Sequence, residues 1–244
     1  MSLPWSVGLW ASALLAVPVH AQVPSSVALA TPPVGQGVNG DWAYVARYRE
    51  ANQALSAQPA PARVVFMGDS ITEGWARQPF IKDNPHYVGR GISGQTAQQM
   101  LVRFRSDVIA LKPAIVHIMA GTNDIARNTG PESPVEIQGY IKSMVELARA
   151  NGIKVVLASV PPAKEFYWHP GLWPAAQIRA LNDWLEQYAA NRGLVYVAYW
   201  SVLATPDGAM KPEYSADGVH PNAAGFEAMR PLAQAAIERA LKRK

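Results

Sequence analysis

Four short polar segments occur in a fixed order along the chain, and together they hold the groups needed to hydrolyse an ester. The segments are Gly68-Asp69-Ser70, Gly94, Gly121-Thr122-Asn123-Asp124 and Asp217-Gly218-Val219-His220. A serine hydroxyl can attack a carbonyl carbon, a histidine can accept its proton, and a carboxylate can orient that histidine. Backbone N–H groups and a side-chain amide can stabilise the resulting oxyanion. The pattern indicates serine-dependent acyl transfer to water.

Ser70 is the candidate nucleophile because it follows an apolar run at 64–67 and precedes the start of a predicted helix at 72–74. At such a strand-to-helix turn the hydroxyl projects from the sheet edge, and the serine N–H lies at a helix N-terminus, where negative charge is stabilised. The alternative is a serine that only caps the helix. Ser93 is a rival, since Gly91-x-Ser93 begins a nucleophile-elbow motif, but Gln95 replaces the second glycine.

Gly94 and Asn123 are the expected partners of the Ser70 N–H in an oxyanion hole. A glycine lets its backbone N–H approach a substrate oxygen closely. An amide N–H directed at a developing oxyanion contributes about 2.7–4 kcal/mol in known cases. Both residues could instead be ordinary turn residues. Asp124, next to Asn123, is expected either to cap the following segment or to orient Asn123.

Asp217 and His220 lie three residues apart in a loop before the last predicted helix. In a tight turn the side chains at i and i+3 lie on one side, so the carboxylate can accept the Nδ1–H and leave Nε2 to face Ser70. Pro221 is expected at the first position of that helix. The other histidines fit the role of base less well: His117 lies inside an apolar strand, His86 in a loop, and His169 in an aromatic loop, as a pocket wall.

The sequence lacks the motifs of several cofactor sites. It has no cysteine, no His-Glu-x-x-His motif, no Walker loop and no EF-hand loop. We therefore expect no metal and no organic cofactor. The net charge is +4 with 16% charged residues, and the basic residues form no stripe with interleaved aromatics, so nucleic acid is not an expected partner. The basic end at 242–244 is expected to be a solvated helix end.

The predicted elements alternate between strands and helices. Apolar runs at 64–67, 87–92, 115–119, 155–158 and 194–198 favour strands that are covered on both faces, hence a parallel sheet. Helical periodicity covers 41–56, 96–111, 134–150, 173–191 and 222–242, the last with an expected break at Pro231. This order predicts a three-layer α/β/α sandwich, and each polar segment follows a predicted strand or lies on a loop beside one, where open sheets place ligands.

The N-terminal region divides into two predicted segments. Residues 1–21 read as a signal peptide, with an apolar stretch at 7–19 and a small-x-small cleavage site at 19–21, although a buried N-terminal helix is the alternative. Residues 22–40 are rich in Pro, Gly, Ser and Ala and read as a flexible linker or tail; the G-x-G-x-x-G at 35–40 lacks a preceding strand. Residues 41–244 are expected to form one domain, periplasmic or secreted, with no integral membrane segment after cleavage.

In order and spacing, the four motifs resemble the SGNH hydrolase family, also called GDSL esterases, over 63–241. The resemblance implies that Ser70 is the nucleophile, that Gly94 and Asn123 form the oxyanion hole with the Ser70 amide, and that Asp217 and His220 complete the triad. It also implies a flavodoxin-like parallel five-stranded sheet with strand order 2-1-3-4-5. Residues 68–75 are similar to the branch that contains carbohydrate O-acetylesterases and relatives of platelet-activating-factor acetylhydrolase.

The expected substrate pocket is rich in tryptophan. Aromatic faces beside an ester site suit a sugar ring or a small acyl chain, although core or surface packing is the alternative. No long apolar lid segment is present, so we expect short acyl groups, O-acetyl on a carbohydrate. A lysophospholipase or thioesterase of the same fold, and a non-catalytic sugar- or envelope-binding module, remain open. The residues expected to line the pocket are Asp69, Trp75, Asp124, Trp168 and Trp173.

Overall fold

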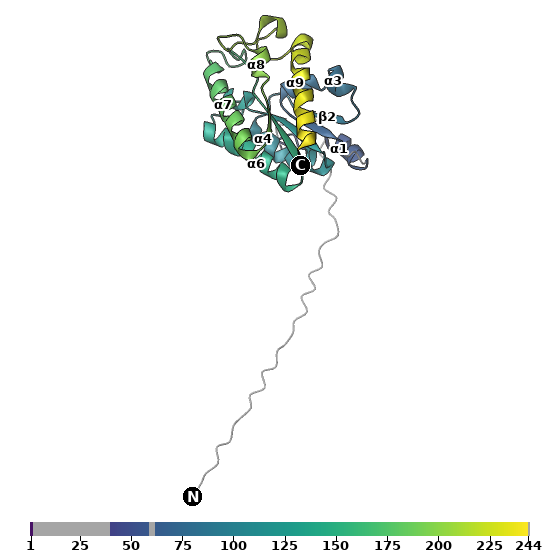
Figure 1. Ribbon diagram of the computed structural model, residues 1–244. Coiled ribbons are helices and arrows are strands. Elements are labelled where there is room, and N and C mark those ends of the chain that lie inside the picture. Colours follow the sequence, from purple (N-terminus) through teal and green to yellow (C-terminus); the bar gives the residue numbers. More distant parts are fainter. Residues whose placement is uncertain (2–39, 59–61, 244) are drawn as a thin grey trace. The chain divides into compact units, whose positions relative to one another are not determined.

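A single parallel sheet organises the part of the chain that the computed structural model describes, which comprises residue 1 and residues 40–58 and 62–243 (Figure 1). Its strand order is β2-β1-β3-β4-β5, and every neighbouring pair is parallel. This confirms the predicted α/β class and strand order. The predicted signal peptide and most of the predicted tail lie outside the described residues. The strands are β1 (Val64–Gly68), β2 (Tyr87–Gly91), β3 (Ile115–Met119), β4 (Lys154–Ala158) and β5 (Val195–Val197).

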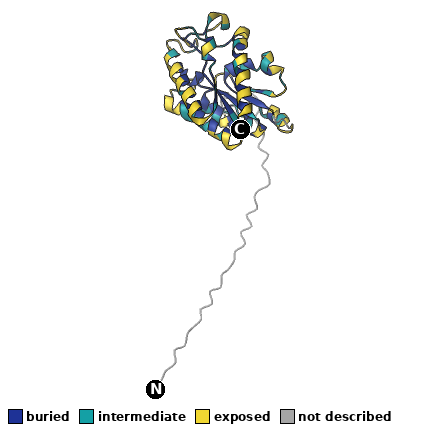
Figure 2. Cartoon of the chain, viewed as in Figure 1, coloured by how far each residue is buried: buried dark blue, intermediate teal, exposed yellow. Residues whose placement is uncertain are grey.

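Helices cover both faces of the sheet and form a hydrophobic core on each (Figure 2). Side chains of β1 divide between the cores by their alternation, with Val65 and Met67 on one side and Val64 and Phe66 on the other. One face carries α4 (Ala97–Asp107), α6 (Pro134–Ala150) and α7 (Ala175–Arg192), with α1 (Arg49–Ser56), η1 (Ile109–Leu111) and α5 (Thr122–Ile125). The other carries α2 (Ser70–Trp75), α3 (Pro79–Lys82), α8 (Trp200–Leu203), η2 (Pro212–Tyr214) and α9 (Ala223–Lys242).

The register of the sheet brings the ends of three strands to one level. Gly68 is paired with both Gly91 and Met119, so β1, β2 and β3 end side by side. A Cβ at Gly91 would lie 2.1 Å from the Glu73 backbone nitrogen and 2.6 Å from the Asp69 carbonyl oxygen. The chain after β1 therefore packs against the end of β2 so closely that no side chain fits there. The loops that follow these strands start from a common edge.

Local sequence signals explain where α6 begins. The Ser133 hydroxyl accepts a hydrogen bond from the Glu136 N–H at 3.3 Å, and the Glu136 carboxylate accepts one from the Ser133 N–H at 2.7 Å. Pro134 occupies the first helical position. This capping box satisfies N–H groups that have no partner inside the helix. The helix spans 134–150, as predicted.

The helix predicted from Asp41 begins only at Arg49, and this part of the prediction is wrong. The Asp41 carboxylate does accept hydrogen bonds from the N–H groups of Val45 and Ala46, each at 2.7 Å. However, Tyr44 has a φ of 54°, which is left-handed and cannot continue a right-handed helix. Residues 41–48 therefore form consecutive turns instead of a helix.

Two predictions about prolines are also wrong. The last helix does not break at Pro231, because α9 runs continuously through it. Pro231 lies on the exposed side, where water can satisfy the carbonyl that it leaves free, while Ala233 and Ile237 pack into the core. Pro221 is not the first helical residue, since Asn222 caps α9 by accepting a hydrogen bond from the Gly225 N–H at 3.0 Å.

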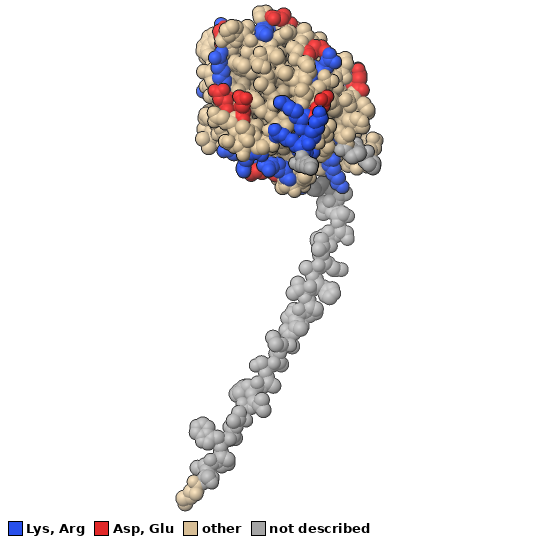
Figure 3. Space-filling view, in the orientation of Figure 1, with Lys and Arg blue, Asp and Glu red and all other residues tan. Residues whose placement is uncertain are grey.

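Basic side chains gather near the C-terminal end of α9 on the face seen in Figure 3. Several of them satisfy backbone carbonyl groups. Lys154 donates to the Leu241 carbonyl at 3.0 Å, and Arg149 donates to the Arg192 carbonyl at 3.3 Å. Cations at helix C-termini are favourable because the last carbonyls there carry partial negative charge. Among the described residues, no helix is long and apolar enough to cross a membrane.

Candidate active site

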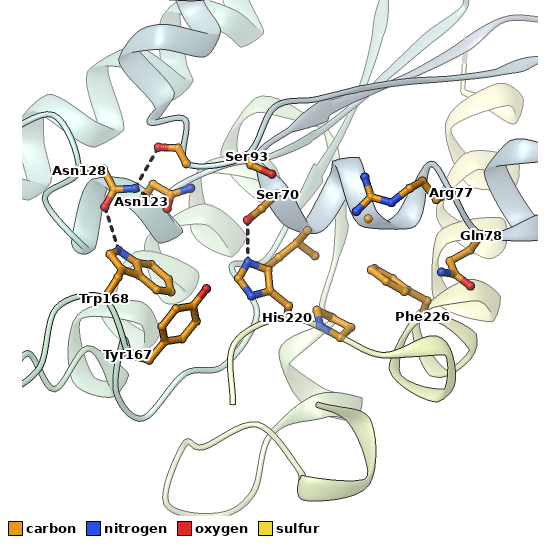
Figure 4. Close-up of a pocket in the computed structure, with 14 residues that line it drawn as sticks. Ser70, Arg77, Gln78, Ser93, Asn123, Asn128, Tyr167, Trp168, His220 and Phe226 are labelled. Carbon is orange, nitrogen blue, oxygen red and sulfur yellow. Dashed lines mark hydrogen bonds between the residues drawn. The ribbon is translucent and has the colours of Figure 1, made fainter. Parts of the chain in front are cut away.

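Ser70 is the first residue of α2 and follows β1 closely. Its hydroxyl contacts His220, which lies 150 residues later in the chain. The Ser70 Oγ lies 2.9 Å from the His220 Nε2 (Figure 4). Asp69 caps the helix, with its Oδ1 accepting a hydrogen bond from the Ile71 N–H at 2.9 Å. The cap fixes the turn that presents the Ser70 hydroxyl to the histidine.

His220 is oriented by Asp217. The His220 Nδ1 lies 2.8 Å from the Asp217 Oδ2, and a carboxylate oxygen can only accept, so Nδ1 carries the proton. Nε2 is then left to accept the Ser70 hydroxyl proton. The Asp217 Oδ1 also accepts the N–H groups of Val219 at 2.9 Å and of His220 at 2.8 Å. Gly218, with a φ of 78°, allows the tight turn that brings these groups together.

The electrostatics of this turn keep Asp217 ionised. Desolvation by itself would raise the pKa of the Asp217 carboxyl. The hydrogen bonds that it accepts from the backbone N–H of His220, from the His220 ring and from the Val219 N–H outweigh that effect and lower the pKa to about 2. The carboxylate is therefore charged at any ordinary working pH and holds His220 in one tautomer.

Gly94 and Asn123, the predicted oxyanion-hole residues, line the same cleft as Ser70 and His220. Gly94 has a φ of 78°, which a glycine adopts without strain. The Asn123 Nδ2 donates to the Gln95 carbonyl oxygen at 3.0 Å and to the Asp69 Oδ2 at a longer 3.3 Å. One amide hydrogen is thus firmly held while the other has a weak contact that an approaching oxyanion could replace.

Sequence reasoning missed Asn128, which connects both predicted oxyanion-hole residues to Trp168. The Trp168 Nε1–H donates to the Asn128 Oδ1 at 3.0 Å, and the Asn128 Nδ2 donates to the Asn123 Oδ1 at 2.9 Å and to the Gly94 carbonyl at 3.0 Å (Figure 4). An indole N–H can only donate, so it fixes which way the Asn128 amide faces. Asn128 in turn holds the Asn123 Oδ1 and so fixes the orientation of the Asn123 amide. Its position five residues after Asn123, just beyond the end of α5, was the available signal.

The cleft around Ser70 has a volume of about 570 Å³. Tyr167 and Trp168 form one wall, and Arg77, Gln78 and Phe226 lie on the opposite side (Figure 4). The Trp168 ring centroid is 6.3 Å from that of His220. The walls thus combine aromatic faces with polar side chains.

The three tryptophans predicted for the pocket have different places. Trp168 lines the cleft, as described above. Trp75 does not: it is fully buried in the core and packs against Phe66 and Phe226, because α2 turns this face toward the sheet. Trp173 is 61% exposed and is not among the residues that line the cleft. The prediction that Trp75 and Trp173 line the pocket is therefore corrected.

The two predicted pocket aspartates are buried beneath the site instead of facing the cleft. Burial raises the pKa of Asp69 to about 6, against the lowering effect of its hydrogen bond from Ile71. The Asp124 oxygens accept the Ala97 N–H at 2.9 and 3.0 Å, so Asp124 caps α4. Burial, with a contribution from the neighbouring Glu132, raises the pKa of Asp124 to about 8. Asp69 and Asp124 therefore each hold the start of a helix by accepting a backbone N–H, Asp69 at α2 and Asp124 at α4.

His117 and Ser93, considered above as rivals, have structural partners. His117 is fully buried, as predicted, with its Nε2 2.9 Å from the Tyr199 hydroxyl, and desolvation lowers its pKa to about 3. Ser93 lines the cleft, but its hydroxyl donates to the Glu73 Oε2 at 2.6 Å. Within 40–58 and 62–243, no group of three or more His, Cys, Asp or Glu side chains is arranged to hold a metal ion.

Known proteins resemble this chain over most of the domain. The model of the GDSL-like Lipase/Acylhydrolase family matches residues 66–228. The crystal structure of a GDSL-like lipase from Bacteroides thetaiotaomicron is 46% identical, with a TM-score of 0.77, and the match covers 82% of this chain and 100% of that one. Esterase TesA of Pseudomonas aeruginosa is 28% identical over 180 residues, 68% of this chain and 83% of TesA. The uncharacterized lipoprotein YqeF of Bacillus subtilis is 33% identical over 120 residues, 42% of this chain and only 49% of YqeF.

Proposed function

Because the chain belongs to the GDSL-like lipase/acylhydrolase family, we propose that it hydrolyses short-chain acyl esters, chiefly O-acetyl groups on carbohydrates, through Ser70, His220 and Asp217. The observation that carries the proposal is the unbroken contact from the Ser70 Oγ to the His220 Nε2 at 2.9 Å and from the His220 Nδ1 to the Asp217 Oδ2 at 2.8 Å. This arrangement opens into a cleft large enough for a small ester.

The proposed reaction is acyl transfer through a covalent intermediate. His220 accepts the Ser70 proton at Nε2 while the Ser70 Oγ attacks the ester carbonyl carbon. The N–H groups of Ser70 and Gly94 and the Asn123 amide stabilise the tetrahedral oxyanion. The protonated His220 then gives its proton to the leaving alcohol oxygen. Water, deprotonated by His220, attacks the acyl-serine and releases the acid and free Ser70.

The oxyanion step requires a small rearrangement at Asn123. One of its amide hydrogens must exchange the 3.3 Å contact with the Asp69 Oδ2 for the substrate oxygen. The other hydrogen stays on the Gln95 carbonyl at 3.0 Å, and the Oδ1 stays on Asn128. The amide is therefore held on two sides while the third faces the cleft. Such preorganisation costs little at the moment of reaction.

The cleft supports a small acyl group on a polar alcohol. Polar lining groups include Arg77, Gln78 and Asn128, and Tyr167 adds a ring that is 62% exposed. A sugar presents apolar C–H faces and a polar rim of hydroxyls, which such a lining can bind. The lysophospholipase or thioesterase alternative requires room for a long acyl chain, so acyl length discriminates between them.

We also propose export, with residues 1–21 as a signal peptide, 22–40 as a tail and 41–244 as the catalytic domain. The apolar stretch at 7–19 supports this, and the relative YqeF is named a lipoprotein. The mass of the protein recovered from expressing cells tests it. Cleavage after Ala21 gives a mature chain that begins at Gln22, whereas a mature protein that retains Met1 would contradict export by this route.

The proposed activity is tested with p-nitrophenyl acetate, butyrate, octanoate and palmitate, followed by acetate release from acetylated xylo-oligosaccharides. We expect activity on acetate and butyrate that falls with acyl length, and its loss in Ser70→Ala. A maximum at octanoate or beyond would assign the protein to lipid or thioester substrates. Sugar binding without hydrolysis of any ester would instead support a non-catalytic module.

A further inference from the structure

We propose that a second binding subsite for a glycan chain lies beside the catalytic cleft, with Trp42 as its aromatic platform and Trp168 as the wall that the two share. The inference rests on the proposed function and extends it, since it assigns a chain of several sugars as the substrate instead of a single acetylated unit. It is carried by a separate cleft, by the way the Trp42 turn is held, and by backbone strain at the same place.

The second cleft has a volume of about 580 Å³ and shares lining residues with the first. Ser93, Gly94, Asn128 and Trp168 line both clefts. A ligand whose ester carbonyl reaches the oxyanion hole at Gly94 can therefore extend past Trp168 without leaving the surface. Of the two clefts, Trp42 lines only the second, and its side chain is 47% exposed and so accessible to a ligand.

Buried side chains hold the turn that carries Trp42. The Gln99 Nε2 donates to the Trp42 carbonyl oxygen at 2.8 Å, and the Gln95 Nε2 donates to the Ala43 carbonyl oxygen at 2.8 Å. Both glutamines are buried, at 7% and 1% exposure. Burying an amide is costly unless it is hydrogen-bonded, so these groups are committed to this turn. The Trp42 backbone is thus fixed to the same segment, after Gly94, that contributes the oxyanion hole.

Backbone strain is concentrated at this cleft. Among the described residues, the non-glycine positions with positive φ are Tyr44 at 54°, Lys112 at 47° and Arg127 at 61°. Tyr44 and Arg127 both line the second cleft. A bulky residue in the left-handed region is strained and persists where the surroundings impose it, often at binding sites. The Asp41 carboxylate also fixes the turn at 41–48 by accepting the N–H groups of Val45 and Ala46.

The chemistry of the cleft fits a carbohydrate. Trp42 and Tyr44 offer aromatic faces for the C–H side of a sugar ring, while Thr129 and His169 offer hydrogen-bonding groups for its hydroxyls. The described lining residues include no carboxylate, so a neutral or acidic sugar fits better than a cationic ligand. The two clefts, which share Trp168 as a lining residue, together offer room for several consecutive sugars.

The test compares a long and a short substrate in the same variant. We expect Trp42→Ala to lower the ratio of kcat/KM for an acetylated xylotetraose over an acetylated xylose about tenfold, mainly through KM, and Trp42→Phe to keep most of it. A ratio is insensitive to the fraction of folded enzyme. The matched control is Trp173→Ala, because Trp173 is another exposed tryptophan and lies outside both clefts. It should leave both rates unchanged.

A binding measurement separates this inference from the proposed esterase activity. Full-length Ser70→Ala is titrated with unacetylated xylotetraose by calorimetry, with and without Trp42→Ala. Binding that weakens about tenfold on loss of Trp42 supports the subsite even if acetylated sugars prove poor substrates. Failure of Ser70→Ala to bind the tetraose, or equal losses on long and short substrates in Trp42→Ala, would overturn it.

Discussion

The loops that follow β1 and β2 each present a serine to the same cleft, yet the two serines have different partners. The Ser70 hydroxyl lies 2.9 Å from the His220 Nε2, whereas the Ser93 hydroxyl donates to the Glu73 carboxylate at 2.6 Å. That carboxylate also accepts the Ser93 N–H at 2.8 Å and pairs with Arg47 at 3.4 Å. A position at the sheet edge therefore does not make a serine a nucleophile. What distinguishes Ser70 is its contact with His220, a base that Asp217 orients. Ser93 instead has a structural contact with Glu73.

The largest difference between the two loops should appear when each serine is removed. We expect Ser70→Ala to lower kcat on p-nitrophenyl acetate on the order of 10⁴–10⁶-fold, as loss of the nucleophile does in other serine hydrolases. Ser93→Ala should change kcat less than about fivefold, because it removes only one hydrogen bond to Glu73. A large loss in Ser93→Ala with a small loss in Ser70→Ala would reverse the comparison.

The second test removes the charge that orients His220. Asp217→Asn should lower kcat about 10²–10⁴-fold, because an amide can hold the histidine in the wrong tautomer. Since the pKa of Asp217 is lowered to about 2, protonation of this carboxylate should not limit activity above about pH 4. A pH profile of kcat/KM for the wild type and for Asp217→Asn checks both points. Wild-type kcat in Asp217→Asn would contradict the assigned role.

A smaller effect is expected at Asn128, which connects Asn123 and Gly94 to Trp168. Asn128→Leu should lower kcat about 10–100-fold with little change in KM, because the Asn123 amide loses the partner that orients it. Trp168→Phe keeps an aromatic ring at this position but removes the indole N–H donor, so we expect kcat to fall about three- to tenfold. Trp173→Phe serves as the control. If KM rose in Asn128→Leu while kcat stayed constant, Asn128 would be a substrate-binding residue and not a positioning residue.

The smallest effect is expected at Glu73, which holds the loop after β2 by accepting hydrogen bonds from Ser93. Glu73→Gln weakens the charge-assisted hydrogen bonds to the Ser93 N–H and hydroxyl. We expect a loss of about 1 kcal/mol in the free energy of unfolding, which corresponds to roughly 2–4 °C in Tm for a domain of this size. The value of kcat should change only a few-fold. Complete loss of activity with an unchanged Tm would show that Glu73 takes part in the chemistry.

The sheet could be predicted from the sequence because its strands are short apolar runs separated by amphipathic helices. The runs at 64–67 and 115–119 are buried throughout, and their period and composition carry that information. The start of α6 is also visible in the sequence, because Ser133 and Glu136 have the spacing of a capping box. The turns at 41–48 were missed because an Asp cap precedes both helices and turns, and the left-handed Tyr44 leaves no signal in residue type.

The candidate site likewise has a part that could be predicted from the sequence and a part that could not. The motifs placed Ser70, His220 and Asn123 at one edge, and the structure brings them together there. The direction of a side chain could not be predicted: Trp75 turns into the core, and one partner of Asn128, Trp168, lies 40 residues away in sequence. Pairings between distant loops depend on packing that local patterns do not encode.

The most direct measurement is covalent labelling with a fluorophosphonate ester, followed by intact mass and peptide mapping. Such a reagent reacts with a serine whose hydroxyl is activated by a neighbouring base. A single adduct on Ser70, strongly slowed in His220→Ala, is the predicted result. An adduct on Ser93, or labelling of Ser70 that does not depend on His220, would contradict the assignment of Ser70 and His220 as nucleophile and base.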